Sequence, residues 1–479
     1  MIPPQDPLET VAQALQHQPG VADWQAQKIT RNSTQLFLIG NQTEARRLVN
    51  AEQIQVSVYN DHPPRNQPPA GASSGAGAIP EEGPGGGTPS GAISTASLAR
   101  GAANRILLAE EIADQARLER ALEESTFIAS LTDNPPYRLP DPPVSGFPAV
   151  ETEDKALIGS DDARLAALGE LRERLLAAVA AEPGIRLSSA ELFATASQIT
   201  LRNSRGILAT RNETDLLCAL VLIASDGAQA AEYYSAPQRR RLADLDIEAL
   251  VRRSARYARD SLRVSMPSTY EGPVVISGQA LVDLFSPLVF HTSARAAYQS
   301  MSRFALGAPI CGEQEVRGDH LTFISNALLP YGQTSAPFSD EGVPGERVIL
   351  IQNSQHQAWW AEQRYADYLN IRPTGSFANI EIPPGTHAAQ DLLEGDGPLY
   401  HLVAFSWLNP DELTGDFVAE IKLGYRLEHG QAAPIKGGSL SGNLFDALAE
   451  VRFSRETQFT GGYTGPEALR FEYLTISGG

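Results

Sequence analysis

The stretch S-A-P-F-S-D-E-G-V-P, at 335–344, lies in the half of this chain that decides its fold. About thirty residues further on, the chain reads R-P-T-G-S, at 372–376. Both stretches stand among short runs of β-type residues, which are separated by Gly and Pro and continue over 273–479. Such runs are typical of strands joined by turns. The pattern predicts a large antiparallel sheet or a distorted barrel with few helices.

Four short motifs follow one another in this half of the chain. They are D-E-G at 340–342, T-G at 374–375, G-D-F at 415–417 and G-N-L at 442–444. Their order and approximate spacing resemble those of the TldD/PmbA family of metallopeptidases, members of which have been labelled modulators of DNA gyrase. The resemblance covers most of residues 273–479, and the turn N-S-R-G at 203–206 is a weaker match. It implies an α+β fold, in which an N-terminal α/β domain with a mixed sheet and helices precedes a mostly antiparallel β domain.

The catalytic members of that family hold zinc with an H-E-x-x-x-H element, whose Glu is the general base, and with a Cys near the C-terminus. The element should follow the first strand of the second domain, where this chain has the apolar stretch Q-A-L-V-D-L-F at 279–285, which we expect to form a helix. The Cys should fall at 460–465, which reads T-G-G-Y-T-G, and the chain contains no His-Glu pair. The resemblance therefore implies a member with no catalytic residues and no metal ligands of its own.

His291 lies just beyond the apolar stretch at 279–285, in the segment H-T-S-A-R-A. This segment supplies neither a base nor a second imidazole, so we interpret His291 as a polar or capping residue rather than a metal ligand. The other histidines of this half show no short ligand spacing, although folding can gather side chains that are distant in sequence.

The resemblance implies a peptide-binding cleft near the D-E-G loop and the T-G turn. The residues expected near this cleft are Asp340, Glu341, Thr374, Gly375, Ser376 and Asn379. Two adjacent carboxylates can bind a divalent cation or act as acid and base, but neighbours on extended backbone point opposite ways, which favours a structural loop. The T-G-S turn can donate backbone N–H groups to a ligand, although an ordinary turn is the favoured interpretation.

A Gly-rich and Ser-rich segment, K-G-G-S-L-S-G at 436–442, superficially resembles the site of amidases that use Ser, Ser and Lys. A serine nucleophile needs a positioned base. Lys436 and Ser439 are three residues apart and would face opposite sides of a strand, so we expect no catalysis here.

The first part of the N-terminal domain, 1–61, shows an apolar helix pattern around 8–15 and β-type runs at 34–39 and 53–59. Residues 62–97 are dominated by Pro, Gly, Ala and Ser, and we interpret them as a flexible insertion because they can bury little apolar area. A helix with apolar positions from Leu98 to Leu118 is expected to continue until D-N-P-P-Y at 133–137, where the prolines end it. A second flexible stretch is expected at 140–160.

The rest of the N-terminal domain, 98–265, ends in a helix–strand–strand–helix pattern that begins at Ala163. The two strands are expected within 187–201 and 215–223, with a hairpin turn at 203–206 between them. The last helix, at 242–262, carries several arginines, which we assign to a solvated face rather than to a phosphate site. The C-terminal domain is expected at 266–479.

Composition excludes several classes of function. The net charge of −19 argues against nucleic-acid binding, which needs a basic face. Two cysteines provide no disulfide framework and fit a reducing compartment. The first residues lack the pattern of a signal peptide and no apolar run is long enough to cross a bilayer, so we expect a cytoplasmic protein without membrane contact.

Together, these features predict the metal-free subunit of a heteromeric zinc metallopeptidase, which completes a channel for extended peptides. The resemblance implies that the zinc belongs to a TldD-like homologue, with which this chain would form a heterodimer, or a homodimer with itself when alone. The alternative is a stand-alone peptide-binding or scaffold protein, or an amide hydrolase with an unrelated site.

Overall fold

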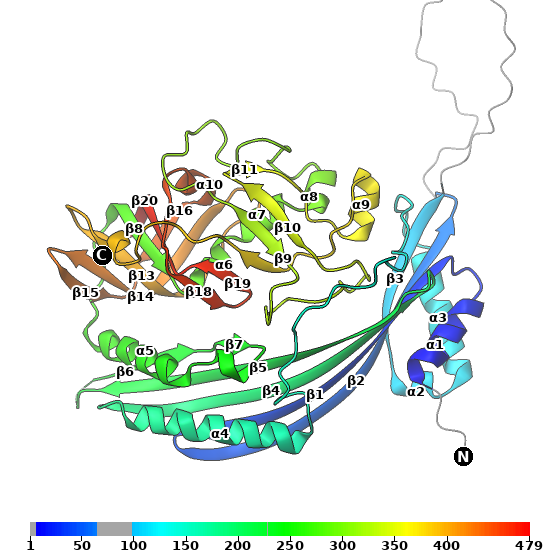
Figure 1. Cartoon of the computed structure of the whole chain (residues 1–479), viewed down its shortest axis with the longest axis horizontal. Helices are drawn as coiled ribbons and strands as arrows, with labels where there is room; N and C mark the ends of the chain where they lie inside the picture. The colour runs from blue at the N-terminus through cyan, green and yellow to red at the C-terminus, as the bar shows by residue number, and fades with distance from the viewer. Residues whose placement is uncertain (1–5, 65–97, 228) are drawn as a thin grey trace, which may run out of the picture. The chain divides into compact units, whose positions relative to one another are not determined.

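The computed structural model describes residues 6–64, 98–227 and 229–479 (Figure 1). Most of the insertion predicted at 62–97 therefore lies outside the described residues. The chain divides into two compact units, which we call the first and the second unit. The first comprises Met1–Lys28, Gln53–Leu139 and Leu201–Leu208, and the second comprises Ile29–Glu52, Pro140–Thr200 and Ala209–Gly479. The domain boundaries expected at 61, 97 and 265 stay predictions.

The strands of the N-terminal half form one sheet, in the order β3-β2-β1-β4-β5-β6, with β7 paired to β5 (Figure 1). They are β1 (Asp23–Ile39), β2 (Gln42–His62), β3 (Ala99–Leu107), β4 (Ile185–Asn203), β5 (Leu208–Ser225), β6 (Ala230–Ser235) and β7 (Gln238–Arg239). The pairs β2–β3, β5–β6 and β5–β7 are antiparallel. β1 and β2 are much longer than the runs predicted at 34–39 and 53–59. The prediction found only these parts because the remaining residues of the two strands are mostly polar and show no regular apolar alternation.

In the first unit, α1 (Pro7–His17) and α3 (Gln115–Ala129) bury apolar side chains with residues of β1, β2 and β3. The helix predicted around 8–15 is confirmed. The helix predicted from Leu98 to the prolines at 133–137 is wrong in its first part, which forms β3, followed by the short α2 (Ala109–Ile112), whereas α3 occupies its last part. β3 pairs with β2 from Ile54↔Leu107 to His62↔Ala99, and this long-range ladder outweighs the local pattern.

In the second unit, α4 (Asp161–Ala180) and α5 (Ile247–Asp260) pack on strand residues of β1, β4 and β5 (Figure 1). The predicted helix–strand–strand–helix order is confirmed, and short 3₁₀ turns at Leu242–Asp244 and Ser261–Arg263 flank α5. Three of its arginines, Arg252, Arg253 and Arg256, are exposed as predicted.

The loop at 140–160 is irregular but packed, so the prediction of a flexible stretch needs correction. Leu157 is buried, and the backbone oxygen of Thr152 accepts a hydrogen bond from the backbone N–H of Thr214. These contacts join residues that are distant in the sequence, so no local sequence pattern indicates that the loop is packed. The hairpin turn at 203–206, within the first unit, forms as predicted: Asn203 Oδ1 accepts hydrogen bonds from the N–H groups of Arg205 and Ile207.

The C-terminal half contains two sheets. One has the order β11-β10-β9-β12-β19-β18, and the other has the order β13-β8-β20-β16-β14-β15, with β17 paired to β20. β13 also pairs with β14, so five strands of the second sheet form a closed ring, and only the pairs β12–β19 and β13–β8 are parallel. The α+β class and the mostly antiparallel, barrel-like second half are confirmed.

The strands of these two sheets are β8 (Tyr270–Ser277), β9 (Phe323–Asn326), β10 (Arg347–Gln352), β11 (Gln355–His356), β12 (Asn379–Glu381), β13 (Leu399–Leu408), β14 (Asp416–Glu428), β15 (Gln431–Ile435), β16 (Ser439–Asn443), β17 (Arg452–Phe453), β18 (Thr457–Thr460), β19 (Tyr463–Pro466) and β20 (Ala468–Ser477). The helices are α6 (Ala280–Leu284), α7 (Ser286–His291), α8 (Ala294–Tyr298), α9 (Gln363–Leu369) and α10 (Leu444–Ala447), with 3₁₀ turns at Asp391–Leu393 and Leu448–Glu450.

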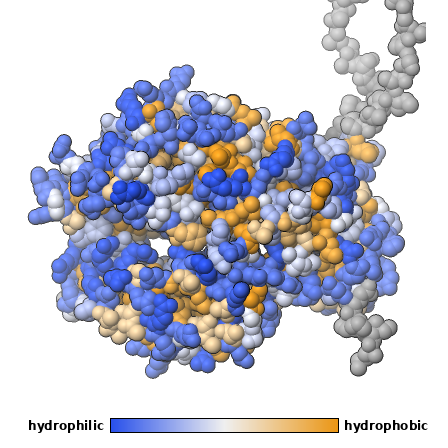
Figure 2. Space-filling view, viewed as in Figure 1, coloured by the Kyte–Doolittle hydropathy of each residue, from blue (hydrophilic) through white to orange (hydrophobic). Residues whose placement is uncertain are grey.

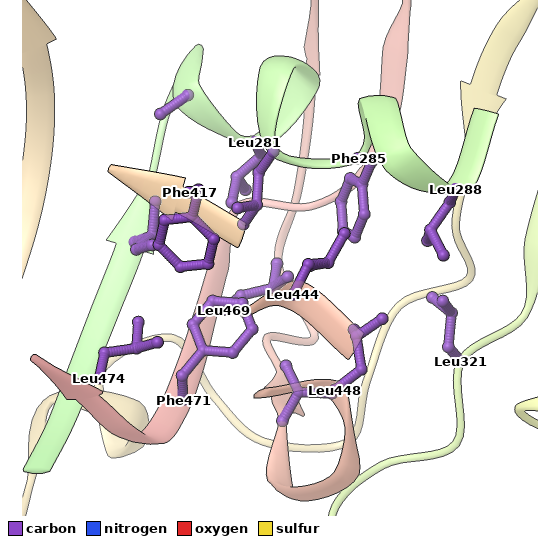
Figure 3. Packing of buried hydrophobic residues seen from close by; sticks show 14 of the residues in the cluster. Leu281, Phe285, Leu288, Leu321, Phe417, Leu444, Leu448, Leu469, Phe471 and Leu474 are labelled. Carbon is purple, nitrogen blue, oxygen red and sulfur yellow. The ribbon is translucent and has the colours of Figure 1, made fainter. Parts of the chain in front are cut away.

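One face of α6 and α7 belongs to the core of the C-terminal half. Figure 3 shows Leu281, Phe285 and Leu288 pointing from these helices toward Leu444 and Leu469, and all five side chains are fully buried. The helix expected in the apolar stretch at 279–285 is therefore confirmed. Because a helix presents different residues to opposite sides, the other face of α6 and α7 remains available for contacts outside the core.

The face of the molecule seen in Figure 2 is mostly hydrophilic, with smaller apolar groups between the polar ones, as suits a strongly acidic chain. Among the described residues, no helix combines the length and the hydropathy that a membrane crossing requires.

Candidate functional site

A cleft of about 760 Å³ opens in the second unit beside α6 and α7. Its walls come from segments far apart in the sequence: α6 and α7, the region of α8, the chain before and within α9, the start of β12, and the turn between β18 and β19. A second cavity, of about 610 Å³, shares Asp283, Ser286, Phe290, Met301 and Glu412 with the first. The two hollows therefore adjoin, and both lie within the size range of ligand-binding sites.

The residues that α6 and α7 contribute to the cleft are Val282, Asp283, Ser286, Val289 and Phe290. Their spacing is that of one helical face, opposite the core-facing leucines of Figure 3. The folding of this segment thus fixes the cleft wall, because the buried face holds the two short helices in place.

Aromatic side chains form a second part of the lining. Trp360 donates a hydrogen bond from Nε1 to the backbone oxygen of Val289 at 2.8 Å, which ties the loop before α9 to α7. The ring of Trp360 meets that of Phe377 edge-on, with 6.0 Å between centroids. Phe290 and Tyr365 also line the cleft. Rings held in this way give a rigid apolar surface for a ligand.

The charged groups of the cleft are mainly acidic. Asp283, Glu362 and Glu412 line it, against a single base, Arg295. Asp283 keeps its carboxylate exposed to the cleft, yet the walls displace enough water to raise its pKa. Burial also raises the pKa of Glu362, and the nearby positive charge of Arg295 acts in the opposite direction.

Asp340 and Glu341, predicted near the cleft, belong to a turn and use their side chains separately. Asp340 is exposed and its Oδ1 accepts a hydrogen bond from Arg211 Nη2 at 2.7 Å. Glu341 turns inward, where its Oε2 accepts a hydrogen bond from the backbone N–H of Gln363 at 2.8 Å. Burial raises the pKa of Glu341 to about 7. Neither residue is among those that line the cleft.

The turn at 374–376 is an ordinary structural turn, as favoured from the sequence. The N–H groups of Thr374 and Gly375 both donate to the backbone oxygen of Ala361, at 2.9 and 3.0 Å. The option that these two groups bind a ligand is therefore wrong, because the loop before α9 already takes them. Gly375 has a φ of +82°, which favours glycine. Ser376 is exposed but is not part of the cleft lining.

Asn379 is fully buried and supports the cleft from behind. Its Nδ2 donates to the backbone oxygen of Asn326 and to Ser335 Oγ, and its Oδ1 accepts from the backbone N–H of Thr334. Its neighbours Ala378 and Ile380 line the cleft instead, because successive side chains on a strand point to opposite faces.

A buried arginine holds the same loop from the other side. The guanidinium group of Arg240 donates to the backbone oxygens of Gly332, Gln333 and Ser335, at 2.7, 2.8 and 3.1 Å. Thr334, which lines the cleft, is therefore fixed by Asn379 and Arg240 together. Sequence reasoning missed Arg240, since nothing in its local sequence marks a residue that contacts a loop about ninety positions away.

The sequence also missed the residues that do line the cleft. Thr334, Glu362, Phe377, Ala378 and Ile380 stand beside or near predicted residues. One signal was present for Asp283: it is the only charged residue in the apolar stretch at 279–285. A lone charge in such a helix marks the face that leaves the core.

His291, expected to be a polar or capping residue, is a buried histidine with hydrogen bonds to the backbone. It is buried, its Nδ1 accepts a hydrogen bond from the backbone N–H of Arg303 at 3.1 Å, and its Nε2 lies 2.9 Å from the backbone oxygen of Leu413. Burial lowers the pKa of His291, which favours the neutral imidazole. Across the described ranges, no three His, Cys, Asp or Glu side chains are grouped to hold a metal ion.

A serine–histidine pair occurs elsewhere in the C-terminal half. Ser277 Oγ lies 2.9 Å from His401 Nε2. Burial lowers the pKa of His401 to about 4, which makes it a weak base, and neither residue lines the two cavities described above. This pair gives no support to a hydrolase of the serine type.

Comparison with known families extends the resemblance seen in the sequence. Residues 269–478 match the family model described as the PmbA/TldA metallopeptidase C-terminal domain. The chain is 26% identical over 260 residues to an uncharacterised protein of Methanocaldococcus jannaschii, a match that covers 52% of this chain and 60% of that protein. It is 24% identical over 210 residues to the zinc metalloprotease TldD homolog of Saccharolobus solfataricus, covering 40% of this chain and 45% of the relative. For the metalloprotease PmbA of Escherichia coli O157:H7, the identity is 26% over 256 residues, with 52% and 55% covered.

These matches span roughly half of the length of the relatives. The solved structures match a larger share of this chain than these relatives do. The crystal structure of TldE from Thermococcus kodakarensis superposes with a TM-score of 0.73 at 15% identity, over 98% of this chain and 99% of that chain. A putative modulator of a DNA gyrase from Thermotoga maritima superposes with a TM-score of 0.75 at 15% identity, over 98% of both chains. The described fold is the fold of these two proteins.

Proposed function

Because this chain belongs to the TldD/PmbA family of metallopeptidase-like proteins, we propose that it is the metal-free subunit of a zinc metallopeptidase pair. In this pair, the chain binds an extended peptide in the cleft beside α6 and α7, and a zinc-bearing homologue cleaves that peptide. The zinc-bearing homologue would be a TldD-like protein with an H-E-x-x-x-H element.

The observation that carries the proposal is the identity of the residues in the cleft wall. The family resemblance expects zinc ligands on the helix after β8 and in the turn before the last strands. In this chain the corresponding segments, α6–α7 and the turn at Gly461–Gly462, line one and the same cleft. They contribute Val282, Asp283 and Ser286 and the two glycines, and no histidine or cysteine.

These residues do not fit a zinc site. Zinc in proteins is held by three or four imidazole, thiolate or carboxylate groups at short distances. The only groups of these kinds in the cleft lining are three carboxylates, and no metal-holding group of three such side chains occurs within 6–64, 98–227 and 229–479. The proposal therefore assigns the activated water to the partner and the alignment of the peptide to this chain.

The cleft supports peptide binding in two ways. Its aromatic side chains offer apolar contact area that is fixed before the ligand arrives, which lowers the ordering cost of binding. Gly462 lines the cleft and carries no side chain, so a peptide main chain can approach it and add backbone hydrogen bonds that do not depend on the peptide sequence.

The test is the affinity of the purified chain for an unstructured, fluorescently labelled peptide, measured by fluorescence anisotropy. Phe290→Ala removes a ring from the cleft and should raise Kd about tenfold, as truncation of a central aromatic contact does. Phe127→Ala is the matched control, because Phe127 is 65% exposed on α3 and outside the cleft. Equal affinities of the two variants and the unaltered chain would overturn the assignment of the cleft.

A further inference from the structure

We propose that the cleft selects peptides in which a basic side chain stands about three positions from a bulky apolar side chain. The inference rests on the proposed function and adds a substrate class to it. It follows from the charges, the unpartnered carboxylate and the aromatic walls of the cleft.

The charges of the lining leave a negative excess. Asp283, Glu362 and Glu412 are opposed only by Arg295. Arg295 lies close enough to Glu362 for its charge to act on the pKa of that carboxyl, so these two residues largely offset one another. The adjoining cavity adds Asp411 and no base. A ligand that enters both hollows therefore meets an excess of carboxylates around Asp283 and Glu412.

Asp283 is the carboxylate best placed to receive a cation. In the described part of the chain its carboxylate has neither a hydrogen bond nor an ion pair, and it is exposed to the cleft. It lines both cavities, as does Glu412. A lysine or arginine side chain of the ligand would give Asp283 a charge-assisted hydrogen bond that the protein itself does not provide.

The neighbouring surfaces suit a bulky apolar side chain. Phe290 and Met301 line both cavities, and Phe290 stands seven residues, about two helical turns, beyond Asp283 on the same face. Trp360 and Phe377 add fixed rings to the larger hollow. Two helical turns span about 11 Å, and residues of an extended peptide advance by about 3.3 Å each, so a basic and an apolar side chain about three positions apart span this distance. The faces of these rings can also bind the cationic side chain through cation–π interactions.

The same features disfavour acidic ligands. A glutamate or aspartate in the ligand would add a like charge beside Asp283 and Glu412, which costs affinity. The net charge of −19 of the whole chain acts in the same direction at longer range, and attraction of basic peptides should weaken as salt is raised.

The experiment compares labelled eight-residue unstructured peptides that differ at one position, by fluorescence anisotropy with the full-length chain. One peptide carries Arg about three positions from Phe, and the others carry Gln or Glu in place of Arg, or Ala in place of Phe. The Arg–Phe peptide should bind about tenfold more tightly than the Glu–Phe peptide, with the Gln–Phe and Arg–Ala peptides between them. Added salt should reduce the difference between Arg and Glu.

Two double variants locate the effect. Asp283→Asn with Glu412→Gln neutralises the two carboxylates that both cavities share, and it should abolish most of the preference for Arg over Glu. Asp396→Asn with Glu420→Gln is the matched control, since both residues are exposed outside the cleft and the change in net charge is the same. Thermal melting verifies that all variants fold; Glu412→Gln alone, at an exposed loop position, provides a second test of the preference.

The outcomes separate the two proposals. Equal affinity for the Arg and Glu peptides overturns the charge preference while peptide binding stands. A preference that survives in the Asp283 and Glu412 double variant overturns the assignment to these carboxylates. Failure of every peptide to bind overturns both the preference and the proposed function.

Discussion

Glu341 carries a carboxyl group whose pKa burial raises from 4.5 to about 7. In the unfolded chain this group loses its proton near pH 4.5, whereas the folded chain holds it up to about pH 7. Between these values the folded state binds more protons than the unfolded state. The free energy of unfolding therefore falls as the pH rises through this window, and the stabilisation present below pH 4.5 is lost above pH 7.

Glu341→Gln should remove this pH dependence while it keeps an oxygen for the N–H of Gln363. The difference in unfolding free energy between variant and unaltered chain should grow by on the order of 2 kcal/mol from pH 4.5 to pH 8. Urea unfolding at several pH values measures it. Glu420→Gln, at an exposed position of β14, is the control. Parallel pH profiles for the unaltered chain and Glu341→Gln would show that Glu341 titrates normally.

The position of single side chains was the hardest feature to predict from the sequence. The motif at 374–376 lies close in sequence to residues that line the cleft, but Asn379 faces away from the cleft and its neighbours Ala378 and Ile380 face into it. A motif identifies a stretch of backbone, whereas the side to which each residue turns depends on the strand partners, which lie far away in sequence. Asp283 could have been singled out, since it is the one charge in an apolar helix.

The loop at 332–335 depends on two buried polar anchors, Asn379 and Arg240. Asn379→Ala would leave the N–H of Thr334, the backbone oxygen of Asn326 and Ser335 Oγ without their present partner. Each unsatisfied buried group costs about 1–3 kcal/mol, so the variant should lose on the order of 3 kcal/mol of stability. Thermal and urea unfolding test this loss.

Asn379→Ala should also weaken peptide binding, and by more than the smaller fraction of folded protein explains, because Asn379 holds Thr334 and Thr334 lines the cleft. Asn50→Ala, at an exposed position of β2, is the matched control and should change neither stability nor affinity. A stable Asn379→Ala variant with unchanged peptide affinity would show that Asn379 does not support the cleft.

Elements with a strong local pattern were predicted well. α1, α4 and α5 each show apolar residues at helical spacing, and each forms close to its expected place. β3 was predicted as a helix because Ile106, Leu107 and Ile112 are consistent with either period over so short a stretch. Its ladder with β2 decides the outcome, and that partner stands some forty residues earlier in the chain.

The whole chain resembles proteins that share only about 15% of its sequence, and their fold is retained over nearly its full length. A fold can survive such divergence because it needs apolar residues of suitable size at core positions rather than particular ones. A zinc site needs specific ligands at specific positions. The cleft of this chain lacks imidazole and thiolate groups in its lining, as the proposed division of labour between two subunits requires.

Reconstitution with a zinc-bearing homologue that carries H-E-x-x-x-H tests this division of labour most directly. Each protein is incubated with a labelled extended peptide alone and in an equimolar mixture, with and without a chelator, and the rate of cleavage is measured. We predict negligible cleavage by this chain alone, and a chelator-sensitive rate for the mixture on the order of a hundredfold above that of the homologue alone, because alignment of the scissile bond is worth about that much. Full activity of the homologue alone, or chelator-resistant cleavage by this chain alone, would contradict the account.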